Sequence, residues 1–248
     1  MAPSDIGSGT RAPLKVLIVG HGRMGRLIES LAPNYGAEIV GTLDEHNNSG
    51  GAGLTTERWP AGSIDVIIEF SQAEPFLQNL PRLASLNANL VIGTTGWKGR
   101  EAEVRQAIEN AGVGAVVAAN FSVGANVLEI VAETAARLFE PQQDYGAFIH
   151  ESHHAAKIDA PSGTAISLKT ALEKGGGYTR RIDMSSTRAG FIPGIHTVGF
   201  DGPSETVTLS HNVRDRATFA HGALAAARWV QGKRGWFTMR DVLGIGGN

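Results

Sequence analysis

Short apolar runs alternate with longer segments of helical periodicity through the first half of the chain, beginning at Lys15. The apolar runs predict strands at 16–19, 39–43, 66–70, 90–92 and 115–118, and the segments between them predict helices at 24–32, 75–86 and 101–111. Strands that alternate with helices form parallel sheets, because each helix returns the chain to the same edge. We therefore predict an α/β fold with a Rossmann-like, doubly wound parallel sheet of five strands.

A polar stretch at 44–62, rich in Gly, Asn, Ser and Thr, interrupts this alternation. Because the strand pattern resumes directly after it, we expect a long loop of the same domain and not a linker. Its position after a predicted strand places it at the edge of a ligand site.

The pattern changes after Phe121, where a helix is predicted at 127–139, a strand around Phe148 and a further helix from about Thr164. Alternating segments at 181–188, 194–200 and 206–212 predict strands of a mostly antiparallel sheet with one solvated face. An Ala-rich helix is expected at 219–230, before the terminal MRDVLG. These elements predict a second, α+β domain.

Composition narrows the classes of protein. The chain has 248 residues, 42% of them hydrophobic, which is enough for one large or two modest domains. The net charge of −2 argues against nucleic acid as a binding partner. We expect no membrane segment because the chain has no long apolar run. The lack of cysteine excludes disulfides and Cys-type zinc sites and suits a cytoplasmic protein, and 1–13 is expected to be a loose leader.

A glycine-rich turn follows the first predicted strand and opens a helix. Its residues are Gly20, His21, Gly22, Arg23, Met24 and Gly25, and Asp44 ends the next strand. In this context the pattern predicts a dinucleotide whose pyrophosphate lies at the helix N-terminus. Asp44 favours NADH because it would repel a 2′-phosphate, whereas Arg23 and His46 leave NADPH open. The alternative is a structural turn with Asp44 closing a strand.

A second concentration of chemistry lies at 151–165. It contains two imidazoles, an ammonium group and a helix start that Ser162 or Thr164 can cap after Pro161. The free amides would hold one carboxylate and Lys157 a second, while a histidine supplies a proton. The alternative is an ordinary capped loop with surface histidines. We expect no metal, because adjacent histidines alternate faces and no third ligand is evident.

The segment ESHHAAKIDAPSGTA resembles the signature of the dihydrodipicolinate reductase family. Supporting matches over about 15–245 are VGHGRMG, VIIEFS, VIGTTGW, AANFSVGAN, GIHTVGF, RATFAHGAL and MRDVLG. The resemblance implies NAD(P)H-dependent reduction of 4-hydroxy-tetrahydrodipicolinate in lysine and diaminopimelate biosynthesis. It also implies a homotetramer, with a dinucleotide-binding domain at 1–123 and 225–248 and a substrate-binding and oligomerisation domain at 124–224.

The resemblance also implies roles for individual residues. His153 would donate the proton with Lys157 as its cationic partner. The residues implied to hold the dicarboxylate are His154, Lys157, Ser162, Gly163 and Thr164. Those implied to meet the cofactor, beyond the glycine turn and Asp44, are Gly93, Thr94, Thr95, Ala118, Ala119, Asn120 and Phe121. His196 and His211 are expected to be structural.

Three departures from the family pattern stand out. The glycine turn is one residue shorter than in some members, and the region 174–179 is expected to be a trimmed loop. Ala225 replaces a frequent basic residue, so a closure contact is expected to move to Arg228.

The alternative functions are a related amino-acid or imine dehydrogenase and a non-catalytic nucleotide sensor.

Overall fold

The structure is a computed structural model that describes residues 12–97 and 99–245. The predicted leader therefore lies almost entirely outside the described residues. Contacts between Cα atoms divide the chain into two compact units, the first comprising residues up to Val117 together with Ala223–Thr238. The second comprises Ala118–Gly222 and the residues from Met239 onward.

The first unit contains a parallel sheet of six strands with the order β10-β5-β4-β3-β1-β2. The strands are β1 (Leu14–Val19), β2 (Ala37–Leu43), β3 (Val66–Glu69), β4 (Asn89–Ile92), β5 (Gly114–Val117) and β10 (Gly235–Phe237). Its helices are α1 (Arg23–Leu31), α2 (Ala73–Ser85), α3 (Glu101–Ala111) and most of α6 (Ala217–Val230), with short 3-10 turns at Ala32–Tyr35 and Ser49–Gly51. The Rossmann-like, doubly wound prediction is confirmed.

Side chains on β1 show why the sheet is covered on both faces. Leu17 and Val19 pack in a core with residues of α2 and α3, while Gly25 of α1 lies against Ile18. Alternate residues of a strand point to opposite faces, so one run of apolar residues serves both layers. The apolar runs that predicted β1, β3 and β4 are therefore buried on both sides, whereas the edge strand β2 is mostly half-buried.

The predicted count of five strands was wrong, because β10 adds a sixth beside β5. Its sequence is only Gly-Trp-Phe. Three residues are too few to show a strand period, and pairing with β5 decides their conformation.

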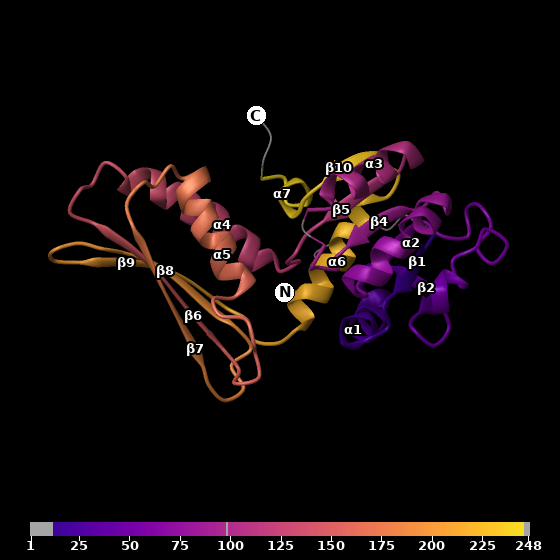
Figure 1. Ribbon diagram of the computed structural model, residues 1–248, viewed down its shortest axis with the longest axis horizontal. Coiled ribbons are helices and arrows are strands. Elements are labelled where there is room, and N and C mark those ends of the chain that lie inside the picture. Colours follow the sequence, from indigo (N-terminus) through magenta and orange to yellow (C-terminus); the bar gives the residue numbers. More distant parts are fainter. Residues whose placement is uncertain (1–11, 98, 246–248) are drawn as a thin grey trace. The chain divides into compact units, whose positions relative to one another are not determined.

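The second unit has a four-stranded sheet with the order β7-β6-β8-β9. Its elements are α4 (Val123–Phe139), β6 (Gly146–His153), α5 (Gly163–Thr170), a π-helical turn (Ala171–Gly175), β7 (Ile182–Arg188), β8 (Ile195–Asp201), β9 (Thr206–Asn212) and α7 (Met239–Val242). Only the β6–β7 pair is parallel, which confirms the mostly antiparallel prediction. Helices α4 and α5 cover one face (Figure 1), where they share an apolar core with the sheet.

Two local features differ from the expectations. The expected loop at 174–179 begins within the π-helical turn that extends α5. Arg228 does not offer a free cation for a closure contact, because it donates to the backbone carbonyls of Tyr35, at 2.6 Å, and Gly36 within the first unit.

The C-terminal residues group differently from the predicted domain division. The prediction placed 225–248 with the first domain, whereas contacts place 239–245 in the second unit. There Arg240 donates to the carboxylate of Glu133 at 2.7 Å. Among the described residues, no helix combines the length and apolar character needed to cross a membrane.

Candidate functional site

The three glycines of the turn after β1 have different surroundings. Gly20 has a φ of +94°, and a Cβ there would overlap the backbone of Phe70. A Cβ at Gly25 would overlap the carbonyl oxygen of Gly20, whereas one at Gly22 would meet nothing within 4 Å. The first glycine thus permits the turn, the third lets α1 approach β1, and the second leaves room for a ligand.

The start of α1 suits an anion. Gly22 is its N-cap and provides no side-chain acceptor for the first amides of the helix. These N–H groups and the positive end of the helix dipole are available to a phosphate. The residues in the turn therefore fit the pyrophosphate of a dinucleotide.

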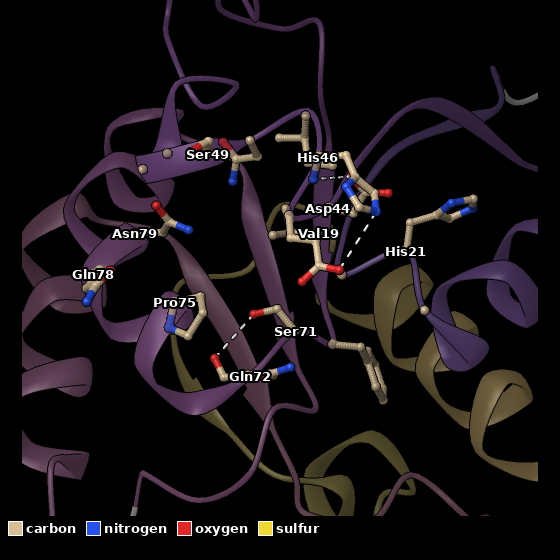
Figure 2. Close-up of a pocket in the computed structure, with 18 of the residues that line it drawn as sticks. Val19, His21, Asp44, His46, Ser49, Ser71, Gln72, Pro75, Gln78 and Asn79 are labelled. Atoms are coloured by element: carbon tan, nitrogen blue, oxygen red, sulfur yellow. Dashed lines mark hydrogen bonds and ion pairs between the residues drawn. The ribbon is translucent and has the colours of Figure 1, made fainter.

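A cavity of about 600 Å³ lies beside this turn at the carboxyl ends of β1, β2 and β3. Four of the predicted cofactor residues line it: Gly20, His21, Gly22 and Asp44. The polar loop expected at the edge of a ligand site contributes Glu45, Asn48 and Ser49 to the lining, whereas sequence reasoning did not assign the other polar lining residues: Arg26, Ser71, Gln72, Gln78 and Asn79. Figure 2 shows Asp44 and His46 together on one side of the cavity, with Ser71, Gln72 and Pro75 on another.

Asp44 is held in place by its own loop. Its Oδ1 accepts hydrogen bonds from the backbone N–H of His46 at 2.9 Å and of Asn47 at 3.3 Å. These bonds, the one from His46 above all, lower the pKa of Asp44, so the carboxyl is ionised at neutral pH. Oδ1 serves the loop, and Oδ2 is the oxygen that can accept from a ribose hydroxyl.

The other predicted cofactor residues lie outside the lining of this cavity. Arg23, Met24 and Gly25 belong to α1, and 93–95 follows β4. Thr94 is buried and donates to the carboxyl of Glu69. A Cβ at Gly93 would overlap the ring of Phe70, so this turn packs against the end of β3.

The segment 118–121 begins the second unit. Asn120 donates from Nδ2 to the hydroxyl of Thr164 at 3.2 Å and accepts from the backbone N–H of Ser122 at 2.8 Å. The structure thus ties a residue predicted to meet the cofactor to one predicted to hold the substrate.

His153 ends β6 and is buried beside Glu151, two residues earlier on the same face. Its Nδ1 lies 2.5 Å from Oε2 of Glu151. A carboxylate accepts only, so we assign the Nδ1 proton to this bond, which leaves Nε2 as the reactive nitrogen. Burial lowers the pKa of His153, and the bond to Glu151 partly opposes that effect.

Glu151 has further donors. Arg188 bonds both carboxylate oxygens, at 2.9 and 2.6 Å, and the backbone N–H of Ser162 donates at 3.2 Å. Burial alone would raise the pKa of Glu151, but the bonds from Arg188, Ser186, His153 and Ser162 lower it to about 2. Glu151 is therefore a permanent anion that orients His153.

Lys157 lies after β6 with its Nζ 2.7 Å from Oδ1 of Asp159. The pKa of Asp159 is lowered, chiefly by this bond. A carboxylate thus already lies against Lys157, which is the contact that the predicted dicarboxylate would make. His154 is only partly buried and follows His153 at the end of the strand.

Ser162, and not Thr164, caps α5, since its Oγ accepts from the N–H of Ala165 at 3.2 Å. The same oxygen lies 3.0 Å from Nε2 of His196. Burial lowers the pKa of His196 to about 4, so this ring is neutral at neutral pH, and its Nε2 shares one hydrogen bond with the Ser162 hydroxyl. Gly163 and Thr164 form the first turn of the helix, where backbone amides have no intrahelical acceptor.

The expectation that no third ligand lies near the histidines was wrong. Glu151, His153 and His196 place possible ligand atoms within 4.8 Å of one another. Arg188 nevertheless donates to both oxygens of Glu151. A guanidinium group at the carboxylate opposes a second cation there, so this geometry favours an ion pair over a metal.

Sequence reasoning missed Glu151, Arg188 and His196 as parts of this cluster. The i, i+2 spacing of Glu151 and His153 was a usable signal, since both side chains lie on one face of a strand. The other two residues are brought in by sheet register, which pairs His153 with Arg188 and Glu151 with His196. Register depends on the tertiary fold and leaves no local pattern.

Comparisons with known proteins match nearly the whole chain to one family. Residues 14–121 match the family model described as dihydrodipicolinate reductase, N-terminus, and 124–243 match the one described as its C-terminus. A 4-hydroxy-tetrahydrodipicolinate reductase of Methanoregula boonei is 37% identical over 253 residues, covering 93% of this chain and 98% of that one. The Neisseria gonorrhoeae protein of the same name is 35% identical over 269 residues, covering 94% and 98%.

A solved structure shares the fold. It is the dipicolinate-bound dihydrodipicolinate reductase from Paenisporosarcina sp. TG-14, with a TM-score of 0.74 and 23% identity. The match covers 91% of this chain and 97% of that one. Both units described above therefore have counterparts in one known structure.

Proposed function

This chain belongs to the dihydrodipicolinate reductase family, and from that premise we propose that it reduces 4-hydroxy-tetrahydrodipicolinate with NAD(P)H in lysine and diaminopimelate biosynthesis. The observation that carries the proposal is the triad in which Arg188 bonds the buried Glu151 and Glu151 bonds the buried His153. It presents one imidazole nitrogen as a proton donor within a segment that also supplies a cation and a helix start.

A nicotinamide dinucleotide fits the first unit. The turn after β1 and the amides of α1 would hold the pyrophosphate, and the bound cofactor supplies the hydride. For the nucleotide we propose NADH, because Asp44 is ionised, and Glu45 beside it also lines the cavity. Both carboxylates would repel a 2′-phosphate. Arg26 also lines the cavity, and its positive charge would attract the phosphates of either nucleotide.

The dicarboxylate fits the second unit. The amides of Gly163 and Thr164 would bind one carboxylate, and Lys157, exchanging Asp159 for the substrate, would bind the other. His154 would complete these contacts. In this arrangement the substrate replaces a contact that the chain already makes with its own carboxylate.

His153 would transfer a proton from its Nε2 to the substrate, which accepts the hydride from the dinucleotide. Glu151 keeps the other ring nitrogen protonated and stabilises the imidazolium before transfer, as a positioning residue. Gly194 leaves space at this nitrogen, since a Cβ there would lie 3.1 Å from Nε2. Glu151 therefore orients the proton donor, and the glycine at position 194 keeps a side chain away from its Nε2.

The test is a coupled assay with purified protein. NADH should be oxidised only when the condensation product of pyruvate and aspartate semialdehyde is supplied, and NADPH should give a higher KM.

His153→Asn should lower kcat by about 10²- to 10⁴-fold while dinucleotide affinity stays unchanged, because proton donation contributes that much. Lys157→Ala should raise the substrate KM as well as lower kcat. No turnover by the wild type, or normal turnover by both variants, would contradict the proposal.

We also propose that the protein is cytoplasmic and forms a homotetramer. Support for self-association comes from exposed apolar side chains on α4, namely Val123, Val127, Val131 and Leu138. An exposed apolar stripe on a soluble enzyme is typical of an interface. Sedimentation of the purified protein as a monomer would refute the assembly.

A further inference from the structure

Glu69 is a buried acid at the end of β3, near the middle of the parallel sheet, and its side chain is fully inaccessible. One carboxyl oxygen accepts from the hydroxyl and the backbone N–H of Ser71, the latter at 3.2 Å, and the other accepts from the hydroxyl of Thr94. These partners are neutral, unlike the Arg188 that meets Glu151. Because a buried carboxyl without a cation is unfavourable, packing alone does not explain this residue.

The partners of Glu69 belong to two different turns at the carboxyl end of the sheet. Ser71 follows β3 and lines the cavity (Figure 2), whereas Thr94 follows β4. Phe70, between Glu69 and Ser71, lies where a Cβ at Gly20 or Gly93 would overlap it. The carboxyl of Glu69 therefore connects the turns after β3 and β4 at the point where the glycine turn also packs.

We propose that Glu69 is a positioning residue for the dinucleotide: through Ser71 and Thr94 it holds the turns after β3 and β4 in the arrangement to which the cofactor binds. This inference rests on the proposed function, and in particular on the cofactor cavity of the first unit. It adds a residue that does not itself line the cavity. Its effect on the cofactor passes through the two hydroxyl groups.

The proton on Glu69 provides a readout that a merely structural residue lacks. Burial raises the pKa of Glu69 to about 7, against the opposing effect of the bonds from Ser71 and Thr94. A dinucleotide brings negative charge into the adjacent cavity, and negative charge favours the neutral carboxyl. Binding should therefore take up protons at neutral pH and weaken as the pH rises from 6 to 8.

Other titratable and charged groups share the cavity with Ser71. They are His21, Arg26, Asp44, Glu45 and His46. Because these groups are the same in the wild type and in variants at position 69, the difference between the two isolates the contribution of Glu69. A fall in affinity with pH that persists in the variant belongs to the other groups of the cavity.

Two substitutions test the role. Glu69→Ala leaves both hydroxyls without their acceptor and should raise the dinucleotide KM about tenfold, with the dicarboxylate KM unchanged. Glu69→Gln has a side chain of the same length and resembles the neutral acid. It should therefore give the dinucleotide KM that the wild type has at pH 6. Titration calorimetry in buffers of different ionisation enthalpy should show less proton uptake on NADH binding to Glu69→Gln than to the wild type.

Asn89 offers a matched control. It is a buried polar residue at the first position of β4, and its side chain bonds the backbone of Gly114, Lys233 and Gly232. It lies at the other end of the strand from Thr94. Asn89→Ala should therefore lower the unfolding temperature while leaving the dinucleotide KM and the proton uptake as in the wild type.

The outcomes separate this inference from the proposed function. If the wild type binds NADH and Glu69→Ala binds it equally well, the inference is wrong and the proposed function stands. Equal proton uptake by the wild type and Glu69→Gln also overturns it. If the wild type binds no nicotinamide dinucleotide, both fail together.

Discussion

Glu151 and Glu69 are both buried carboxyls, and their partners give them opposite pKa shifts. Both are desolvated, which raises the pKa of each. Arg188 and several other donors outweigh that effect at Glu151, whereas Glu69 has only hydroxyl and amide donors. The same residue type is thus a fixed anion in one unit and a group that titrates near neutral pH in the other.

The fixed charge of Glu151 should be visible in the pH dependence of turnover. Proton donation needs protonated His153, so kcat falls as the pH rises through the pKa of His153, which lies below its ordinary value. Glu151→Gln removes the anion that opposes this lowering. The descending limb of the kcat profile should therefore move to lower pH, and kcat at pH 7 should fall by about tenfold or more.

The control for this prediction is the dinucleotide KM, which should not change in Glu151→Gln. A pH profile that coincides with that of the wild type would show that Glu151 has no influence on the proton donor.

At the scale of elements, α5 and α4 begin in the same way. Ser162 and Ser122 are their N-caps, each with its Oγ accepting from the amide three residues later, at 3.2 and 3.3 Å. Only the cap of α5 adjoins the predicted substrate contacts at 163–164. This similarity allows stability and binding to be separated.

Both cap substitutions should destabilise the protein, but only one should weaken substrate binding. Ser162→Ala and Ser122→Ala should each lower the free energy of unfolding by ~1 kcal/mol, because each helix loses an acceptor for one of its first amides. Ser162→Ala should in addition raise the dicarboxylate KM. Denaturant titration and steady-state kinetics check the two effects, and equal KM values for both variants would contradict the placement of the carboxylate at α5.

Periodicity predicted most elements because most of them bury an apolar face. It missed β10, whose three residues are strand only through pairing with β5. It also did not distinguish Ser162 from Thr164 as the cap, since both residue types can accept from an amide. The choice between them depends on the backbone angles at the start of α5, which local composition leaves open.

For the whole molecule, Glu69 makes stability depend on pH in the direction opposite to most acids. Its pKa rises from 4.5 to about 7 on folding, so the folded state binds the proton more tightly than the unfolded state. Stability therefore decreases as the pH rises from about 4.5 to about 7, and the cost of ionisation is complete above that range. Glu151 acts in the opposite direction: its pKa falls from 4.5 to about 2 on folding, so its contribution to stability is present above about pH 4.5 and is lost as the pH falls from there to about 2.

Glu69→Gln should therefore stabilise the protein at high pH. The gain at pH 8 relative to pH 5 should approach ~3 kcal/mol as an upper limit, because each pKa unit corresponds to about 1.4 kcal/mol. Urea unfolding of the wild type and the variant at both pH values measures it. A difference between the two proteins that does not change with pH would contradict the assignment.

The sequence by itself determined the turn and the histidine-rich segment, since these depend on neighbouring residues: three glycines after a strand, and His153, Lys157 and Ser162 within ten positions. Only the tertiary structure decided that Arg188 and His196 join Glu151, and that Glu69 joins Thr94. In each case the partner lies on another strand or its turn. Strand register brings such residues together, and register is set by the packing of the whole sheet.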